Sequence, residues 1–269
     1  MKIEEIRSLL RQEPTEEQLN MIEKDERIGV QKLYSSYLNQ IKEKEKETER
    51  FSKMLTYEKQ YWQQGITFVG GTDEAGRGPL AGPMVVAAVL LPNDIFISGL
   101  NDSKQLSAKK RELIYDEICI KALSIAVNIV SVADIDRYNI YQAAKLGMEA
   151  CISFLRPKPE VVLADAMPLQ IDNMKTISLI HGDALSATIA AASIIAKVTR
   201  DRIMLDLDQA YPEYGFAANK GYGSRKHMEA IAQYGVTRWH RRTYEPVKSM
   251  IKDNISTEVD CASKIFRIK

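Results

Sequence analysis

Residues 72–79 read Thr-Asp-Glu-Ala-Gly-Arg-Gly-Pro and directly follow the strand-like run of residues 66–71. The two adjacent carboxylates, Asp73 and Glu74, thus stand where a strand is expected to give way to a turn that holds two glycines and an arginine. Carboxylates bind hard divalent cations, whereas exposed backbone amides and a guanidinium suit phosphate or sugar oxygens. The segment therefore offers candidate metal ligands and a candidate grip on nucleic acid.

From residue 65 onward the pattern predicts an α/β fold. Short β-branched runs bounded by Gly, Pro, Asp or Asn predict strands, and longer runs of good helix formers predict helices. We expect strands at 66–72, 84–91, 123–131, 161–164 and 176–180, and helices at 107–120, 141–155, 186–211 and 226–234. No clear helix separates the first two strands, so antiparallel pairs are expected among the first three. The predicted architecture is a mixed β-sheet flanked by helices.

Residues 1–64 have a different character. An apolar stripe at helical spacing, a capping box at Thr15–Gln18 and an alternating Glu/Lys run predict a small, all-helical N-terminal appendage. Its 12 Lys/Arg and 13 Asp/Glu nearly cancel, which gives no sign of a nucleic-acid arm and favours contact with the main domain or with a partner. The expected division is 1–64 helical extension, 65–215 catalytic core and 216–269 helical substrate-binding region.

Two further carboxylates follow apolar runs. Asp165 ends the run 161–164, and Asp183 stands between another strand and the helix expected from Ser186. Each residue alone is most simply a cap or a turn former. Three strands that each end in carboxylate, however, favour a shared divalent-metal site. Adjacent strand residues face opposite sides of a sheet, so Asp73 and Glu74 are expected to share that site only through a chain bend supplied by residues 75–78.

Composition narrows the functional classes. The chain has 269 residues and a formal net charge of +1, so any basic surface must be local. No apolar run approaches the roughly 20 residues of a membrane span, and the polar start is unlike a secretory signal. Cys119, Cys151 and Cys261 lack zinc-site spacing and are expected to be reduced thiols in a cytoplasmic protein. Metal chemistry here is expected to be carboxylate chemistry.

Two glycine motifs are rejected. Residues 76–81 match G-x-G-x-x-A, but a strand follows them where a dinucleotide site needs a helix. Residues 221–224 lack the G-K-[ST] ending of a phosphate-binding loop.

With these residues in place, the chain resembles the type 2 ribonucleases H, and within them ribonuclease HII. The matching motifs are in order over residues 65–250: residues 71–79, Asn101–Lys104, Ala164–Ala166, Gly182–Asp183, Ala191–Asp201 and Lys220–Ser224. The resemblance implies a ribonuclease H-like fold and an endonuclease that cuts RNA paired with DNA and single ribonucleotides in duplex DNA, with a role in ribonucleotide excision, DNA replication and repair. The helical extension lies outside the matched part and is typical of a longer bacterial form.

The resemblance also implies roles for particular residues. The catalytic, metal-binding acids would be Asp73, Glu74, Asp165 and Asp183, with two Mg²⁺ or Mn²⁺ ions. The turn that reads the ribose 2′-hydroxyl would be Gly76, Arg77 and Gly78, and Tyr222 would stack near the RNA–DNA junction. Ser224 and Tyr244 depart from the family pattern, where threonine and phenylalanine are expected. The sister family, ribonuclease HIII, usually has glutamate as its fourth acid and a sheet-containing N-terminal domain, so Asp183 and the helical extension favour HII.

The resemblance to a two-metal nuclease implies in-line hydrolysis that leaves a 5′-phosphate and a 3′-hydroxyl. Duplex binding is expected to come from residues 197–252, where 11 Lys/Arg outnumber 6 Asp/Glu among aromatics, and from Lys104 as a phosphate contact. The three histidines are expected to be hydrogen-bonded rather than metal-bound. Taken without the resemblance, Arg77 is a simple phosphate contact and Tyr222 a surface turn residue.

Two alternatives remain open, a noncatalytic nucleic-acid-binding protein and another two-metal polynucleotidyl transferase such as an integrase or junction resolvase. The first predicts loss of an acid, and the glycine-arginine-glycine turn argues against the second. The enzyme is expected to be a monomer with no membrane partner.

Overall fold

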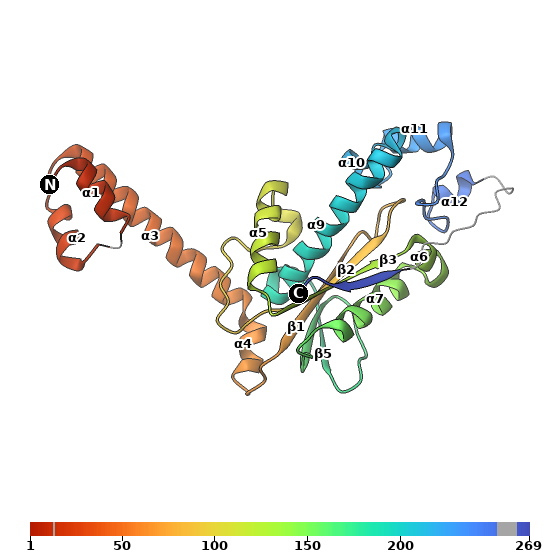
Figure 1. Cartoon of the computed structure of the whole chain (residues 1–269), viewed down its shortest axis with the longest axis horizontal. Helices are drawn as coiled ribbons and strands as arrows, with labels where there is room; N and C mark the ends of the chain where they lie inside the picture. Colours follow the sequence, from red (N-terminus) through yellow and green to blue (C-terminus); the bar gives the residue numbers. More distant parts are fainter. Residues whose placement is uncertain (13, 252–262) are drawn as a thin grey trace. The chain divides into compact units, whose positions relative to one another are not determined.

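The structure is a computed structural model that describes residues 1–12, 14–251 and 263–269. Its contacts divide the chain into two compact units, Met1–Ser52 and Lys53–Lys269. This division falls earlier than residue 64, where composition alone places the boundary. Figure 1 shows the whole chain, coloured along its sequence.

The first unit is helical, as its sequence pattern predicts. It holds α1 (Ile3–Leu10), α2 (Glu16–Glu23) and most of α3 (Ile28–Met54). Ile6, Ile22 and Val30 form its buried centre. The predicted capping box is present, because the Thr15 hydroxyl accepts from the Gln18 amide while the Gln18 side chain accepts from the Thr15 amide.

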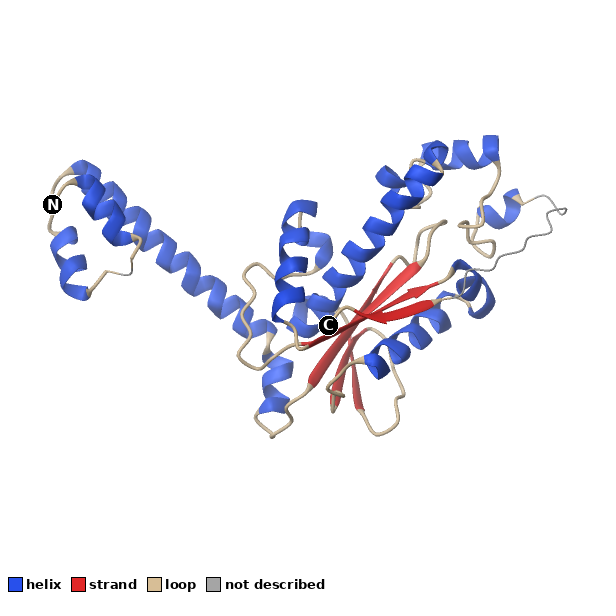
Figure 2. Cartoon of the chain, in the orientation of Figure 1, coloured by secondary structure: helices blue, strands red, loops and turns tan. Residues whose placement is uncertain are grey.

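The second unit is a mixed sheet with helices on both faces (Figure 2). Its strands are β1 (Val69–Ala75), β2 (Met84–Leu90), β3 (Ser124–Val130), β4 (Val161–Asp165), β5 (Lys175–Leu179) and β6 (Lys264–Arg267). Its helices are α4 (Thr56–Trp62), α5 (Ala108–Lys121), α6 (Val132–Tyr138), α7 (Ile140–Phe154), α8 (Gly182–Leu185), α9 (Ala187–Ala210), α10 (Phe216–Asn219), α11 (Arg225–Tyr234) and α12 (Val247–Met250), with single 3₁₀ turns η1 (Ser103–Gln105) and η2 (Pro212–Tyr214).

The strand order is β5-β4-β1-β2-β3-β6. As predicted, the first three strands pair antiparallel, whereas β4 and β5 run parallel to β1. The sequence pattern did not predict β6, a short strand that pairs antiparallel with β3 and joins the otherwise helical C-terminal region to the sheet. The carboxyl ends of β1, β4 and β5 therefore meet at one edge of the sheet, which is where α/β sheets commonly place their ligands.

Helix α9 covers one face of the sheet and α7 the other (Figure 1). The first three turns of α9 are almost wholly buried, which confirms the close packing predicted from its alanine-rich sequence. The contact is tight at Gly71, where a Cβ atom would lie 2.3 Å from the Thr188 carbonyl carbon. This close approach sets the N-terminal half of α9 beside the end of β1.

The element boundaries differ from expectation in one place that matters. Strand β1 starts at Val69 rather than residue 66 and continues to Ala75, so Asp73 and Glu74 lie inside the strand. Pairing with β2 explains the difference, because it continues to Ala75 opposite Val85. Among the described residues, no helix combines the length and the apolar character that crossing a bilayer demands.

Candidate active site

Parallel pairing brings three of the four candidate acids to one sheet edge. Thr72 is in register with Ala164, so Asp73, two residues before the end of β1, lies beside Asp165 at the end of β4. Asp165 is in turn in register with Leu179 at the end of β5. Asp183 comes from the short helix α8 that follows β5. The structure thus places all four carboxylates where the three parallel strands end.

Asp73 and Glu74 do not share a bend. They pair in regular register with Ala87 and Val86, so their side chains leave opposite faces of the sheet. The expected turn begins only at Gly76, whose φ is +99°. The charges of both carboxylates nevertheless act on the same neighbourhood, because Asp165 raises the pKa of each.

Local hydrogen bonds hold the acids in place. Asp73 Oδ1 accepts from the Glu74 amide at 2.7 Å, and its side chain also bonds to Ser193 of α9. The Ser193 hydroxyl lies 2.9 Å from that of Ser103. On the neighbouring strand, Asp165 Oδ1 accepts from the Gly182 amide at 2.7 Å, which ties β4 to the start of α8. Sequence reasoning missed Ser193, because only the packing of α9 shows that it faces Asp73.

The candidate acids are destabilised in their charged forms by burial and by their like-charged neighbours. Burial raises the pKa of Asp73 well above its usual value, and the charges of Glu74 and Asp165 raise it further. Burial also raises the pKa of Glu74 to about 7, although the Arg77 guanidinium counteracts the shift. The pKa of Asp183 is raised by burial and by the nearby Asp102 and Asp165 carboxylates. A divalent cation would relieve this repulsion.

The donor set fits such a cation. Glu74 Oε2 is buried without a hydrogen-bond partner, and the candidate ligands are all carboxylate oxygens, which suit Mg²⁺ or Mn²⁺. In the described part of the chain, no three acidic, histidine or cysteine side chains lie close enough together to enclose an ion on their own. The acids form an open cluster that a cation would draw together.

Two charged residues beside the acids come from η1 and its N-cap, Lys104 and Asp102. Lys104 Nζ lies 3.7 Å from Asp183 Oδ2, and its side chain is 79% exposed. Burial lowers the pKa of Lys104, but the neighbouring acids, Asp183 first, more than compensate and raise it. Sequence reasoning singled out Lys104 but not Asp102, whose side chain accepts from the Lys104 amide at 2.8 Å. The motif that carried the resemblance, residues 101–104, held the signal for both.

The turn after the acids packs against two buried arginines. A Cβ atom at Gly76 would lie 2.1 Å from Arg200 Nε, so only glycine fits there. Arg241 donates to the carbonyls of Gly76 at 2.6 Å and Arg77 at 2.8 Å, and Arg200 donates to that of Pro83 at 3.0 Å. Burial lowers the pKa of Arg200 to about 10, and the neighbouring Arg241 adds to the shift.

Tyr222 lies next to this turn. A Cβ atom at Gly78 would stand 3.6 Å from Tyr222 Cε1, and Tyr222 is 51% exposed. The loop that carries it is fixed to the segment after the turn, because the Leu80 and Ala81 amides both donate to the Gly221 carbonyl. The predicted sugar-reading turn and the predicted stacking tyrosine are therefore neighbours.

The prediction that residues 197–252 form a basic duplex-binding surface holds for fewer residues than expected. Arg200 and Arg241 are buried beneath the turn and bond to main-chain carbonyls, so they are not available to a duplex backbone. Tyr214 and Phe216 belong to the core, as the sequence suggested for most aromatics. Cys119 and Cys151 are free thiols, whereas Cys261 and Lys252 lie outside the described residues.

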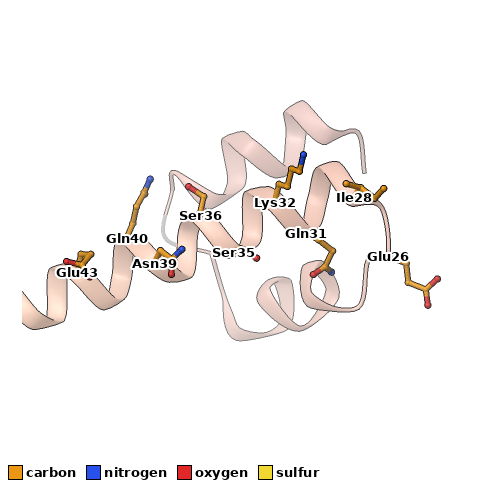
Figure 3. A pocket seen from close by; sticks show the side chains of 9 residues that line it. All are labelled: Glu26, Ile28, Gln31, Lys32, Ser35, Ser36, Asn39, Gln40 and Glu43. Atoms are coloured by element: carbon orange, nitrogen blue, oxygen red, sulfur yellow. The ribbon is translucent and has the colours of Figure 1, made fainter.

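The N-terminal unit has a hollow of its own (Figure 3), with a volume of about 830 Å³. Its lining side chains are mostly polar and come from α3 and from the loop just before it: Glu26, Ile28, Gln31, Lys32, Ser35, Ser36, Asn39, Gln40 and Glu43. All four candidate acids lie in the second unit.

Comparison with known families agrees with this placement. Residues 70–247 match the family described as "Ribonuclease HII", and residues 2–62 match the "Ribonuclease HII N-terminal domain". A relative from Bacillus cytotoxicus named "Ribonuclease HII" is 51% identical over 94% of this chain and 98% of its own length. A Bacillus anthracis relative of the same name is 50% identical over 93% of this chain and 98% of its own length.

Solved structures give the same picture. The ribonuclease H2 of Pyrococcus horikoshii matches with a TM-score of 0.59 and 30% identity over 68% of this chain and 96% of its own. The RNase HII of Archaeoglobus fulgidus, solved in complex with PCNA, matches with a TM-score of 0.56 and 28% identity over 66% and 95%. A Bst-RNase HIII solved with Mn²⁺ shares 19% identity at a TM-score of 0.54, over 69% of each chain, and supports the fold alone.

Proposed function

The chain belongs to the ribonuclease HII family and is a type 2 ribonuclease H acting on RNA/DNA hybrids; from this premise we propose that it also incises duplex DNA at single embedded ribonucleotides. The observation that carries the proposal is the juxtaposition of the acid cluster with the turn Gly76–Gly78 and with Tyr222. The carboxylates would carry out hydrolysis. The main chain of the turn and the Tyr222 ring, directly beside them, would contact the sugar of a single nucleotide.

Discrimination of ribose follows from main-chain donors. The carbonyls of Gly76 and Arg77 point toward Arg241, and in a planar trans peptide the amide on the other side of the bond points the opposite way. The amides of Arg77 and Gly78 therefore face away from the guanidinium. A 2′-hydroxyl would pair with groups of this turn, whereas a deoxyribose would leave them unpaired, which costs a substrate far more than losing one contact.

The acids would bind two divalent ions, Mg²⁺ or Mn²⁺, through Asp73, Glu74, Asp165 and Asp183. When bound, the ions supply an activated water and stabilise the departing 3′-oxygen in an in-line displacement. The chain's own groups orient the carboxylates: Ser193 fixes Asp73, and the Gly182 amide fixes Asp165. Lys104, exposed beside Asp183, is proposed to contact a phosphate of the cut strand. We expect products with 5′-phosphate and 3′-hydroxyl ends.

We further propose that the enzyme works as a cytoplasmic monomer in ribonucleotide excision during DNA replication and repair. The nearly neutral net charge supports local rather than global attraction to the duplex. Exposed basic residues between positions 202 and 248 remain candidates for that local attraction, and they predict affinity that falls as salt rises.

The test is cleavage of a DNA duplex that carries one internal ribonucleotide, with Mg²⁺ or Mn²⁺ and with an EDTA control. Metal-dependent incision on the 5′ side of the ribonucleotide, leaving a 3′-hydroxyl, is the expected result. A long RNA/DNA hybrid serves as the second substrate. Cleavage of the hybrid alone would reject ribonucleotide incision while leaving the family's hybrid activity in place.

A further inference from the structure

A chain of hydrogen bonds connects two buried histidines to the main chain of Tyr222. The Thr237 amide lies 2.9 Å from His240 Nδ1, His240 Nε2 lies 3.1 Å from His227 Nε2, and His227 Nδ1 lies 2.8 Å from the Tyr222 carbonyl. Both imidazoles are buried. The mechanism proposed above uses neither of them.

The two ends of this chain determine where each proton lies. A backbone amide can only donate, so His240 Nδ1 accepts and its proton is on Nε2. A carbonyl can only accept, so His227 Nδ1 carries the proton and its Nε2 is free to accept. The contact between the two Nε2 atoms is then one ordinary N–H···N bond. Every group along the path is satisfied by two neutral rings in one pair of tautomers.

The surroundings keep the pair neutral. The ring of Tyr214 lies 5.1 Å from that of His240, and the ring of Phe216 lies 5.3 Å from that of His227. A second proton on either ring would also bring two N–H groups face to face along the path. Burial lowers the pKa of His240 to about 3 and lowers that of His227 as well, which agrees with two neutral rings.

We propose that His227 and His240 are positioning residues that fix the Tyr222 main chain, and through it the tyrosine ring beside Gly78, for selection of single ribonucleotides. The geometry supports this because the Tyr222 carbonyl receives only one other bond in the described structure, from the Ser224 amide at 2.8 Å within the same loop. The His227 ring therefore links the Tyr222 carbonyl to α11, beside the bond that the Ser224 hydroxyl accepts from the His227 amide, and connects it through His240 to the segment that also carries Arg241. The inference rests on the proposed function of Tyr222.

The first experiment tests the tautomers without any assay of activity. In the full chain labelled with ¹⁵N, two-bond ¹H–¹⁵N spectra near neutral pH distinguish protonated from unprotonated ring nitrogens. We expect His227 protonated only at Nδ1 and His240 only at Nε2. The opposite tautomers, or a charged ring, would overturn the proposal.

The second experiment uses matched variants. The amide nitrogen of asparagine can take the place of Nδ1, so His227→Asn keeps a donor for the Tyr222 carbonyl while His227→Phe removes it. Likewise His240→Gln keeps a donor toward His227, and His240→Asn does not. We expect His227→Phe and His240→Asn to lower kcat/KM on a single-ribonucleotide duplex about tenfold, with a much smaller loss on a long hybrid, and the matched partners to restore most of it.

A double variant separates positioning from general damage. In a Tyr222→Ala background, His227→Phe should cause no further loss on the single-ribonucleotide duplex, because both changes remove the same interaction. Equal losses on both substrates, or additive losses in the double variant, would reject the positioning role. A wild-type enzyme that fails to incise single ribonucleotides would reject the proposed function instead, and the tautomer measurement would still decide the arrangement of the pair.

Discussion

The guanidinium of Arg241 donates to the carbonyl of Gly76 at 2.6 Å, across 165 residues of sequence. The same side chain reaches the carbonyls of Arg77 and Gly82 and the Tyr244 hydroxyl. One rigid, planar cation thereby fixes both sides of the turn that follows the acids. Because trans peptides point their amides opposite to their carbonyls, this clamp also aims the amides proposed to meet the ribose.

Arg241→Lys should therefore damage substrate choice and stability together. The three donors of lysine all sit on one nitrogen, so an ammonium cannot reproduce the planar fork with which arginine reaches the carbonyls of Gly76, Arg77 and Gly82. We expect about 2–4 kcal/mol less stability in urea unfolding, since buried carbonyls lose their partners. The preference for a ribonucleotide over a deoxyribonucleotide should fall as well. Arg242→Lys is the matched control, because the contact described for Arg242 is made by its backbone amide, and a similar loss there would contradict the clamp.

The acid cluster should make the metal-free enzyme less stable as pH rises. Burial raises the pKa of Glu74 from 4.5 to about 7, so the folded state holds its proton more tightly than the unfolded state does. The resulting stability is present in full below pH 4.5 and is lost as pH rises through about 7. Asp73, whose pKa is raised in the same way, adds to the effect.

The variant Asp73→Asn tests whether repulsion between the buried carboxylates destabilises the metal-free enzyme. With EDTA at pH 8 the variant should be more stable than wild type by about 1–3 kcal/mol, because it removes a buried charge next to two others. Cleavage should nevertheless fall by several orders of magnitude, while duplex binding remains. Mn²⁺ should raise Tm in the wild type much more than in the variant. A variant that is less stable than wild type at pH 8, or that cleaves normally, would remove Asp73 from the cluster.

Sequence alone predicted the parts of this fold that depend on local pattern. The β-branched runs placed the five principal strands, and the antiparallel start of the sheet followed from the missing helix between residues 72 and 84. Strand β6 was not predicted because four residues of Lys-Ile-Phe-Arg show no pattern until β3 lies beside them. The turn falls within the predicted residues 75–78, but pairing with β2 extends β1 through Glu74, so the turn does not bring Asp73 and Glu74 to one face as expected.

The candidate acids could be predicted from the sequence, but the residues that hold the site in place could not. Ser193, Arg200 and Arg241 show no local sign of their roles. Only the fold brings Ser193 to Asp73 and the two arginines to the turn. Glu58 is the clearest case: it is fully buried, and it accepts from the Thr188 amide and hydroxyl across 130 residues of sequence. Such contacts depend on tertiary packing, and the local sequence pattern carries no information about it.

Because of Glu58, two N-terminal deletions of different length are expected to differ in stability. It lies on α4, in the second unit, and also accepts from the hydroxyl of Ser186, the N-cap of α9. Removing residues 1–52 keeps this contact, whereas removing residues 1–64 leaves the start of α9 uncapped by its carboxylate. We expect the shorter deletion to remain folded and able to cleave hybrids. The longer one should lose several kcal/mol of stability in urea unfolding. Equal stability of the two would contradict the role given to Glu58.

Point variants isolate the same contact. Glu58→Ala should cost about 3 kcal/mol, because it removes the acceptor shared by three buried donors and leaves a cavity behind. Burial raises the pKa of Glu58, so the neutral isostere Glu58→Gln should cost much less. Urea unfolding of both variants measures the difference. If glutamine costs as much as alanine, the negative charge rather than the hydrogen bonds holds α9.

Lys104 offers a charge that can be changed without disturbing the fold. Its side chain is 79% exposed and stands 3.7 Å from Asp183, so Lys104→Met should change Tm by little. If Lys104 meets a phosphate of the cut strand, the substitution should lower kcat/KM about tenfold and reduce the slope of log affinity against log salt by about one. Lys104→Arg, which keeps the charge, should retain most of the activity. Unchanged salt dependence in Lys104→Met would assign the lysine to Asp183 alone, as a counter-charge that steadies the acid between turnovers.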